Sequence, residues 1–523
     1  MIFIRGAMAA VEELVPNNKK YLKAIISCQT ALFVGVLLRL LLFTLDDSLW
    51  RDEAMLLMGL RSVSILELFR ELPYAQRCPF ALALLWKCMM GLGMTGAHWI
   101  RLPSLAAGIA QLFIFALLAK MTFSQAKSQP NVIIWLAAVA PQLILFSNQT
   151  KPYIFDVLCA TLLIFLALPF FLGDEQQSQR YVPLILASWF SLTISYPAIF
   201  VVGGICAGLL IKNGLRKLGP LLTLCLGAAI IVLLTLTLAG ESSSYMQNFW
   251  EKGYEGFPRL HVVWWIRALA HSLFFGLSSP SYLGAMKVLL SFGWLFAPLC
   301  ALGIIHLWRT KQHGLLCVLL SPLVFCLSAS FFHRYPFHSR LILFTMPHVF
   351  ILLSYGIIHV SSYFRLKLIV QWGLWTAVAL CCIISIIEYS YPCKGIRHGL
   401  SYIASREKPG DKIIVDLYAS QVVRYYQVLA HKNQRVRFPH ADLIYEWQDQ
   451  TKSKGRPTPE EIVDWLPAKS RVWVLAEADQ YHRNLTPLTR TSVQIMNGLL
   501  MRSRKVVHSL EVPRVLVICF SNE

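Results

Sequence analysis

The sequence predicts an α-helical polytopic membrane protein with about eleven transmembrane helices, one re-entrant or interfacial segment and a small C-terminal α/β soluble domain. Composition is the first observation behind this fold class: 56% of the 523 residues are hydrophobic and only 15% are charged, whereas soluble domains are nearer half apolar and a quarter charged. The second is a mean hydropathy of +0.55. The third is that long apolar runs continue almost to residue 393 and then give way to a mixed composition. The excess apolar surface belongs in lipid, which excludes a soluble enzyme.

Charge and cysteine content exclude two further classes. The formal net charge is +20, and in a membrane protein such an excess mostly reflects cytoplasmic loops rich in Lys and Arg, so we expect no nucleic-acid partner. The 13 cysteines include no CxxC pair and mostly lie inside apolar runs, where a thiol behaves as a small hydrophobe. They indicate neither a disulfide framework nor a zinc site.

A short cytoplasmic N-terminal segment, residues 1–23, is predicted to precede a retained first helix. The apolar run at 24–45 is longer than the core of a signal peptide and can cross a bilayer at about 1.5 Å per residue. Further apolar segments are predicted at 98–121, 131–148, 152–172, 181–196, 198–211, 219–239, 284–307, 314–331, 341–360 and 368–389. The membrane region is therefore expected to extend over residues 24–392.

The positions of the cations predict the orientation. With a cytoplasmic N-terminus, the loops that carry Lys and Arg between these segments fall on the inside, as the positive-inside rule requires. This holds only if the segment 79–94, which is short and carries Lys87, does not cross the membrane. We therefore expect that segment to be re-entrant or interfacial and the C-terminus to lie outside the cytoplasm.

Residues 393–523 are predicted to form the extracytoplasmic α/β domain. Apolar runs typical of buried strands occur at 412–417, 471–475 and 514–520, with helical stretches at 419–431 and 459–466. The domain contains no GxGxxG or GxxxxGK[ST] motif, so a nucleotide-binding role is not expected.

The most informative stretch is the acidic sequence DDSLWRDEA at 46–54, which opens the first outer loop, 46–97. A carboxylate beside apolar walls can have a raised pKa suited to proton abstraction, and Asp52 is the candidate general base. The alternative is that these acids only mark a helix end and solvate a loop. From Glu53 onward the apolar spacing is helical with one apolar face, which favours a helix lying along the membrane surface.

An ordered set of motifs carries a family resemblance. A first span with an inner arginine, Arg39, is followed by LWRDEA at 49–54, an amphipathic helix and a proline-led apolar segment at 78–80. The later motifs are RLPSL at 101–105, SNQTKPY at 147–153 and YPFHSRL at 335–341. This set resembles the GT-C glycosyltransferases, and within them the protein-mannosyltransferase-like branch that includes the Rgt-type and ArnT-type lipid-modifying enzymes. Cys78 stands where that branch usually has the first of two prolines, and Lys151 where an Arg is common.

The resemblance implies a GT-C-like fold and an inverting transfer of a sugar from a polyprenyl-phosphate carrier to an extracytoplasmic acceptor, an envelope glycolipid or polysaccharide, in a bacterial inner membrane. It gives Asp52 the role of base and makes Glu53 a second catalytic residue that orients a neighbour or the substrate. One carboxylate is enough on chemical grounds, since the leaving phosphate is a stable anion that departs without a general acid.

The leaving phosphate needs positive charge, which Arg or Lys can supply without a metal. The candidate substrate-binding residues are Arg340, Lys151, Tyr153, Arg101, His333 and Arg334. Arg340 is preferred because a cation at the start of an apolar span is costly without an anion nearby, although snorkelling to the headgroups is the alternative. Arg39 could support the acidic loop or snorkel outward. With no HExxH or paired histidine spacing, we expect no catalytic metal and no cofactor besides the lipid-linked donor.

Two other functions compete with this one. A polytopic transporter or lipid flippase would explain the many helices without catalysis, but transporters place ionisable residues near the bilayer midplane and often have two related halves. An oligosaccharide ligase or polymerase would share the lipid-linked donor and transfer a preassembled glycan.

Overall fold

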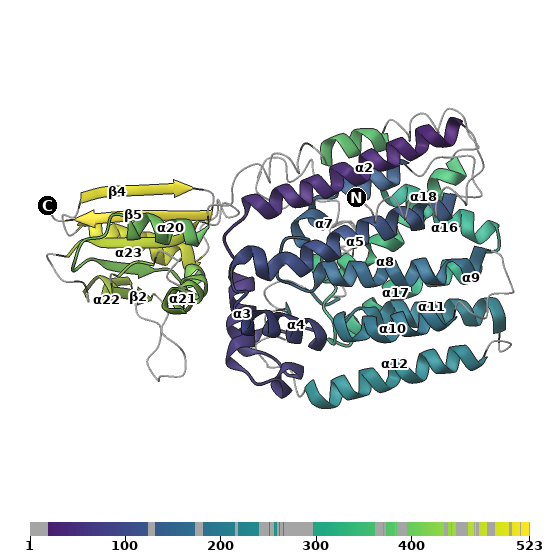
Figure 1. Cartoon of the computed structure of the whole chain (residues 1–523), viewed down its shortest axis with the longest axis horizontal. Helices are drawn as coiled ribbons and strands as arrows, with labels where there is room; N and C mark the ends of the chain where they lie inside the picture. Colours follow the sequence, from purple (N-terminus) through teal and green to yellow (C-terminus); the bar gives the residue numbers. More distant parts are fainter. Residues whose placement is uncertain are drawn as a thin grey trace.

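The computed structural model describes two parts of the chain, a helical bundle and a C-terminal α/β domain at one end of it (Figure 1). The described residues are 19–123, 131–172, 181–214, 218–239, 250–251, 256–258, 261, 265, 296–360, 370, 373–381, 383, 395–432, 438–440, 442–445, 459–464, 466, 470–478, 487–501, 505–512 and 514–521.

The helices of the bundle follow the apolar runs of the sequence. Their bounds are α2 Lys19–Leu45, α3 Arg51–Ser62, α4 Phe80–Gly91, α5 Ala97–Phe123, α6 Asn131–Val139, α7 Pro141–Phe146, α8 Tyr153–Ala167, α9 Pro169–Leu172, α10 Tyr181–Ile194, α11 Ala198–Asn213, α12 Leu218–Ala239, α16 Ala297–Arg309, α17 His313–Phe331 and α18 Met346–Val360. Three short 3₁₀ helices accompany them: η1 Leu66–Phe69, η2 Pro73–Ala75 and η9 Ser339–Thr345. Most of the predicted segments 284–307 and 368–389 lies outside the described residues.

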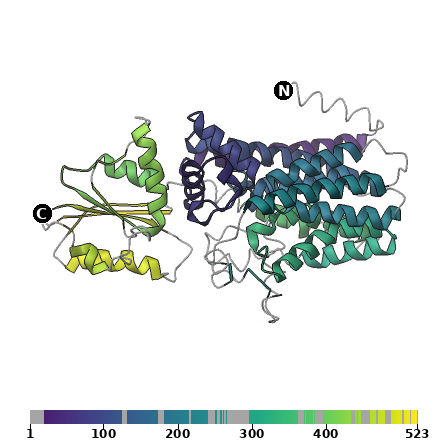
Figure 2. The same ribbon diagram turned by 90° about the horizontal axis from the view of Figure 1, so that it is seen from below.

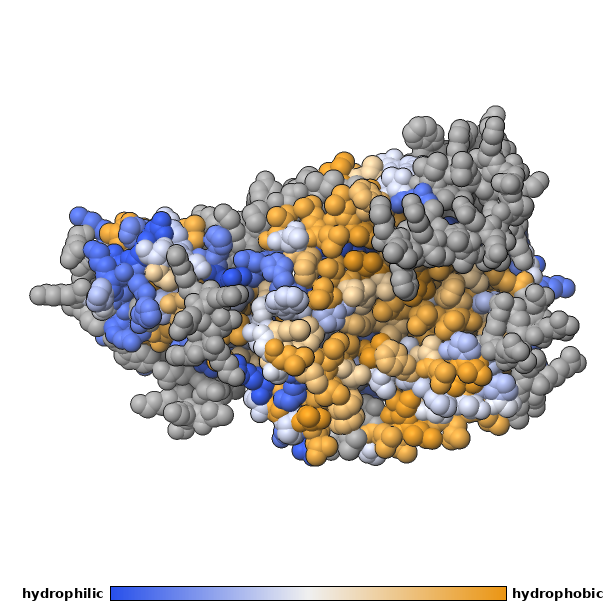
Figure 3. All heavy atoms as spheres, viewed as in Figure 1, coloured by the Kyte–Doolittle hydropathy of each residue, from blue (hydrophilic) through white to orange (hydrophobic). Residues whose placement is uncertain are grey.

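Five of the described stretches are long and apolar enough to cross a membrane: Cys28–Leu45, Ala97–Phe123, Tyr153–Leu172, His313–Phe331 and Ser339–Val360. Hydrophobic residues dominate the visible face of the bundle, and hydrophilic ones gather on the C-terminal domain (Figure 3). This is the surface of a multi-pass membrane protein. The count of about eleven crossings stays a prediction.

The segment 79–94 forms α4, a helix of 12 residues. At about 1.5 Å per residue it is far shorter than the hydrocarbon core of a bilayer, which is about 30 Å thick. Helices α3 and α4 lie together at the end of the bundle that faces the C-terminal domain (Figures 1 and 2). Their length and position agree with the expected interfacial or re-entrant segment.

The predicted apolar segment 131–148 is two helices rather than one. Helix α6 ends at Val139 and α7 begins at Pro141, because proline has no amide hydrogen to continue the ladder. Arg39 Nη1 donates to the carbonyl of Ala138 at 3.0 Å, and so satisfies a backbone group near the break. Since Arg39 is 0% exposed, outward snorkelling was wrong, whereas its support of the acidic loop stays a prediction.

The C-terminal domain contains a mixed five-stranded sheet of order β2-β1-β3-β5-β4. Strand β1 runs parallel to β2 and β3, whereas β5 runs antiparallel to β3 and β4. The bounds are α20 Ile396–Ala404, β1 Lys412–Val415, α21 Leu417–Lys432, β2 Asp442–Tyr445, α22 Pro459–Asp464, β3 Val472–Ala478, α23 Pro487–Met501, β4 Lys505–Val512 and β5 Arg514–Ser521.

Helices cover both faces of this sheet, α20 and α21 on one side and α22 and α23 on the other (Figure 2). Successive side chains of a strand point to opposite faces of its sheet, so β1 contacts the helices on both sides. Ile413 and Val415 belong to the core shared with α20 and α21, whereas Ile414 packs with Val463 of α22. Helix α21 also packs against α3, so the domain contacts the bundle next to the acidic motif.

Candidate active site

The acidic motif forms the start of α3. Trp50 is its N-cap residue, and Asp52 and Glu53 lie in its first turn, where the helix dipole favours negative charge. The backbone amide of Trp50 donates to Glu53 Oε2 at 2.9 Å, as in one half of a capping box. The helix therefore begins at a defined residue and places two neighbouring carboxylates at the end of the bundle (Figure 1).

Arg101, in the first turns of α5, holds the loop that precedes α3. Its Nε and Nη2 donate to the two oxygens of Glu53 at 2.9 and 2.5 Å, a bidentate pair. Its Nη1 donates to the carbonyl of Asp46, and its Nη2 also to that of Ser48, both at 2.9 Å. Arg101 is only 2% exposed. These donors are directed at the protein, and a role of Arg101 in substrate binding stays a prediction.

Glu53 is enclosed by hydrogen-bond donors of the protein, an arrangement that suits the orienting role expected for it. Besides the two Arg101 bonds and the Trp50 amide, it accepts the backbone amide of Thr150 at 2.7 Å, and the side chain is 0% exposed. Burial raises the pKa of Glu53, but Arg101 and the hydrogen bonds outweigh it and lower the pKa below its ordinary value. These hydrogen bonds of Glu53 link α3, α5 and the loop before Lys151 to one another.

Asp52 faces Arg340. Asp52 Oδ2 lies 3.2 Å from Arg340 Nη2, and Asp52 Oδ1 lies 3.7 Å from Arg51 Nε. Burial raises the pKa of Asp52, but the neighbouring cations, Arg340 first, outweigh it and lower the pKa below its ordinary value. The raised pKa expected from apolar surroundings was therefore wrong, because the sequence does not reveal how many cations surround this carboxylate.

Aromatic rings hold the Arg340 guanidinium. Its central carbon lies 5.6 Å from the ring of Trp50 and 5.5 Å from the ring of Tyr153, within the range of cation–π attraction. Arg340 is the second residue of η9 and follows Ser339, whose φ of 36° is uncommon for a residue other than glycine. The ion pair with Asp52 turns Arg340 toward the protein, which favours the binding role over snorkelling.

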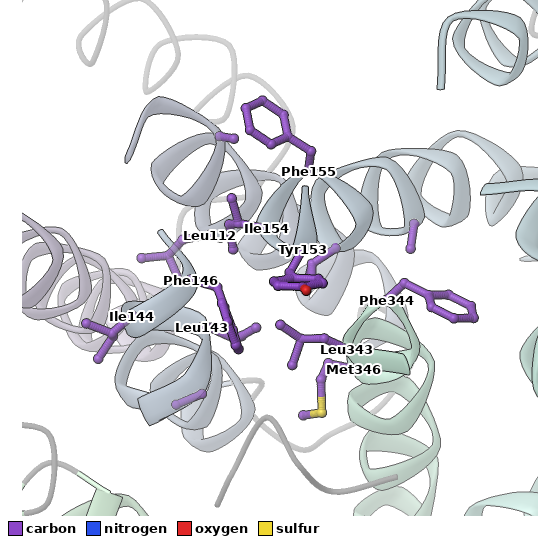
Figure 4. Packing of buried hydrophobic residues seen from close by; sticks show 14 of the residues in the cluster. Leu112, Leu143, Ile144, Phe146, Tyr153, Ile154, Phe155, Leu343, Phe344 and Met346 are labelled. Carbon is purple, nitrogen blue, oxygen red and sulfur yellow. The ribbon is translucent and has the colours of Figure 1, made fainter. Parts of the chain in front are cut away.

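Tyr153 begins α8, where α7, α8 and η9 meet. Figure 4 shows it beside Phe146 and Leu343, and the ring centroids of Phe146 and Tyr153 are 5.0 Å apart. Tyr153 is buried in this apolar group while its ring contacts Arg340. It therefore fixes the guanidinium from the bundle side.

Lys151 lies beside the same ion pair. Its ammonium donates to Gln76 Oε1 at 2.5 Å. Burial lowers the pKa of Lys151 to about 8; the charge of Asp52 raises it, and that of Arg340 lowers it further. The two cations and Asp52 thus form one electrostatic group, here called the Asp52 cluster: Asp52, Lys151 and Arg340.

His333 and Arg334 lie apart from the Asp52 cluster. Both are exposed on the turn after α17, and His333 stacks on Phe257 with ring centroids 4.5 Å apart. In the part of the chain that the structure describes, neither side chain forms a hydrogen bond or an ion pair with Asp52, Lys151 or Arg340.

Two residues at the site were missed by sequence reasoning. Trp50 was read only as part of a motif, and Gln76 lies in a loop without a recognisable pattern. Two consecutive residues of that loop, Tyr74 and Ala75, have φ of 64° and 53°, conformations that usually cost energy. The positive φ values are invisible in the sequence because neither residue is glycine.

The arrangement combines one ionised carboxylate with two buried or half-buried cations at the end of a membrane bundle. A carboxylate can accept a proton from a hydroxyl, and the cations can bind a phosphate. Within the described ranges, no group of three or more His, Cys, Asp and Glu side chains is arranged to hold a metal ion.

Comparison with known proteins shows which solved structures have a similar fold. No protein-family model and no curated protein matches the sequence. The crystal structure of ArnT from Cupriavidus metallidurans in the apo state is similar, with a TM-score of 0.51 at 12% identity over 96% of this chain and 98% of that chain. ArnT bound to undecaprenyl phosphate gives a TM-score of 0.46 at 12% identity, covering 95% of this chain and 97% of that chain. The chain has the fold of ArnT, as the resemblance carried by the ordered motifs leads us to expect.

Proposed function

We propose that this protein is an integral-membrane inverting glycosyltransferase that moves a sugar from a polyprenyl-phosphate carrier to an extracytoplasmic acceptor, an envelope glycolipid or polysaccharide. The observation that carries the proposal is the Asp52 cluster, in which a carboxylate lies 3.2 Å from Arg340 and beside the buried Lys151. This combination suits a reaction that needs one base and one phosphate-binding pair of cations. ArnT, whose fold the chain shares, has also been crystallised with undecaprenyl phosphate.

The reaction follows from these groups. Asp52 accepts the proton of the acceptor hydroxyl as its oxygen attacks the anomeric carbon from the face opposite the phosphate. The bond between that carbon and the phosphate oxygen breaks, and its electron pair stays on the phosphate. Arg340 and Lys151 stabilise the charge that develops on the leaving group, so no metal or further cofactor is part of the proposal.

The low pKa of Asp52 in the free protein is compatible with its role as a base, because the bound donor would change that pKa. A phosphate bound to Arg340 and Lys151 would cancel much of their charge and remove the main influence that lowers the pKa of Asp52. Donor binding would then raise that pKa and make Asp52 a better base. The order of events, donor first and proton transfer second, is part of the proposal.

The proposed orientation follows from the charges of the loops and the position of the site. The N-terminus is cytoplasmic, and α3, α4 and the C-terminal domain face the outside of a bacterial inner membrane. The donor carrier would approach from the surrounding membrane lipids, and the acceptor from the outer side.

Mass spectrometry of envelope glycolipids and polysaccharides tests this function directly. A strain that lacks the gene should lose a sugar-sized mass from one envelope component, and the wild-type protein should restore it. An unchanged envelope in the deletion strain would contradict the transferase and favour the transporter or flippase.

Replacement of Arg340 should weaken donor binding. Loss of a charge-assisted hydrogen-bond pair costs about 1.5–3 kcal/mol, so Arg340→Ala should lower the affinity for undecaprenyl phosphate roughly 10- to 100-fold. Arg340→Lys should restore only part of it, because an ammonium cannot form the bidentate contact or stack between Trp50 and Tyr153. Both effects are measured by binding of undecaprenyl phosphate to the purified proteins in detergent. Equal affinity of wild type, Arg340→Ala and Arg340→Lys would remove Arg340 from the phosphate site.

Anion binding should also depend on the protonation of Lys151. Because the pKa of Lys151 is about 8 in the free protein, the cation is present below that pH and is lost as the pH rises through it. A bound phosphate favours the cation, so affinity for undecaprenyl phosphate should be constant from about pH 7 to 7.5 and fall by up to about tenfold per pH unit above 8.

Lys151→Met provides the control for this pH effect. It should bind undecaprenyl phosphate more weakly at pH 7 and show no decline between pH 8 and 9, since no ammonium remains to titrate. A decline of equal size in both proteins would assign the effect to another group.

A further inference from the structure

The loop Asp46–Trp50, here called the acidic loop, is held from two sides. From the bundle side, Arg101 binds the backbone carbonyls of Asp46 and Ser48. From the opposite side, Tyr426 in α21 of the C-terminal domain accepts a hydrogen bond from the backbone amide of Leu49 at 3.0 Å. A short segment of backbone thus bridges the two parts of the protein.

Tyr426 is a buried contact. The side chain is 4% exposed, and burial raises its pKa to about 12 against the opposing effect of hydrogen bonds to Leu49 and Ser48. Its hydroxyl is therefore neutral and can accept from an amide and donate at the same time. Arg397 of α20 adds an ion pair with Asp47 at 3.2 Å, but both side chains are about 40% exposed, and such pairs contribute little.

The acidic loop leads directly into the Asp52 cluster. Leu49 is followed by Trp50, whose ring contacts Arg340 and whose amide is bound by Glu53. Asp52 is the second residue of α3 and pairs with Arg340. A shift of the Leu49 backbone would therefore move the ring that holds Arg340 and the helix start that holds Asp52.

We propose that Tyr426 is a positioning residue for the reaction, through which the C-terminal domain sets the geometry of Asp52 and Arg340. This inference rests on the proposed function for its catalytic consequence. It makes the C-terminal domain part of the catalytic machinery, although none of its side chains belongs to the Asp52 cluster. A displacement of about 1 Å in a reacting group can cost about 100-fold in rate, so one hydrogen bond to the loop can matter.

The neighbouring Tyr425 provides a matched control. Its hydroxyl also crosses to the membrane part, where it donates to the carbonyl of Thr95 at 2.7 Å, and the side chain is 3% exposed. Thr95 lies in the turn between α4 and α5 and not in the acidic loop. The two tyrosines thus make similar bonds between the same two parts of the protein, and only one of them holds the backbone that leads to Asp52.

The test compares Tyr426→Phe with Tyr425→Phe in the full-length protein. In detergent, hydrogen exchange of the peptide covering the acidic loop should be about five- to tenfold faster in Tyr426→Phe and within about twofold of wild type in Tyr425→Phe, because only the first loses the bond to the Leu49 amide. In cells with matched protein levels, Tyr426→Phe should restore the envelope sugar about tenfold more slowly than wild type, and Tyr425→Phe at the wild-type rate.

Three results would overturn the proposal. Unchanged exchange in Tyr426→Phe would show that the bond does not hold the loop. Faster exchange with full transfer would show that the loop does not set the site. Equal loss of transfer in both variants would reduce the C-terminal domain to a general support. If wild type itself restores no sugar, the proposed function fails, and the exchange data still decide whether Tyr426 holds the loop.

Discussion

Asp52→Asn is expected to give a folded, membrane-inserted protein that transfers no sugar. The amide has nearly the shape of the carboxylate but cannot accept the proton of the acceptor hydroxyl, and a positioned base contributes about 10²- to 10⁴-fold to a rate. Asp52 keeps 14% of its side chain exposed and Arg340 keeps 23%, so the guanidinium can still be hydrated once the carboxylate charge is gone. Envelope mass spectrometry of a complemented deletion strain measures the loss.

Asp47→Asn is the matched control for this experiment. Asp47 lies in the acidic loop that leads to Asp52, and its half-exposed carboxylate pairs with Arg397 rather than with Arg340. Its replacement should leave transfer within about twofold of wild type, since exposed ion pairs contribute about 0–1 kcal/mol. Full activity of Asp52→Asn would remove the base assignment and favour a transporter or flippase, whereas equal loss in both variants would indicate a general need for negative charge in the loop.

The helices of the bundle could be predicted from the sequence because lipid demands long apolar runs. The predicted segments 98–121 and 198–211 differ from α5 and α11 by at most two residues at either end. The break between α6 and α7 was missed although Pro141 is visible in the sequence. Hydropathy alone predicts one segment where an apolar run continues through a proline. The hydrogen bond from Arg39 to Ala138 near the break could not be predicted either, because the two residues are far apart in the chain.

In the C-terminal domain, the central strands were predicted and the edges were not. The runs at 412–417, 471–475 and 514–520 correspond to β1, β3 and β5, the three inner strands of the sheet, whose central residues are apolar. Strands β2 and β4 lie at the two edges of the sheet, and their sequences DLIY and KVVHSLEV carry polar residues. Edge strands need no continuous apolar run, so the pattern that found the others could not find them.

At the site, sequence motifs indicated Asp52 and Arg340 but could not distinguish an arginine enclosed by protein groups from one that stays partly exposed. Arg101 and Arg340 both stand near the start of an apolar span. Only the tertiary contacts show that Arg101 is enclosed by Glu53 and backbone carbonyls, whereas Arg340 keeps 23% of its side chain exposed beside Asp52. Trp50, Gln76 and Tyr426 were missed for the same reason, since each acts through a residue distant in sequence.

Removal of Arg101 should destabilise the protein rather than change its affinity for the donor. Arg101→Leu would leave the buried carboxylate of Glu53 without its cation and the carbonyls of Asp46 and Ser48 without a donor. Loss of one partner of a buried ion pair costs about 3–5 kcal/mol. We expect a much lower melting temperature in detergent and little monodisperse protein. Glu53→Gln should act similarly, because its amide group would present N–H donors to groups that are themselves donors.

Arg340→Leu is the matched comparison for Arg101→Leu, because each variant removes an arginine from an ion pair with a carboxylate. Arg340 and Asp52 are partly exposed, at 23% and 14% of their side chains, so the separated charges can still be hydrated. Arg340→Leu should therefore keep most of the thermal stability and lose transfer, whereas Arg101→Leu should lose stability first. If both variants melt like wild type, the Arg101–Glu53 pair is not what holds α3 to α5. If instead Arg101→Leu is stable and binds undecaprenyl phosphate poorly, Arg101 belongs to the substrate site after all.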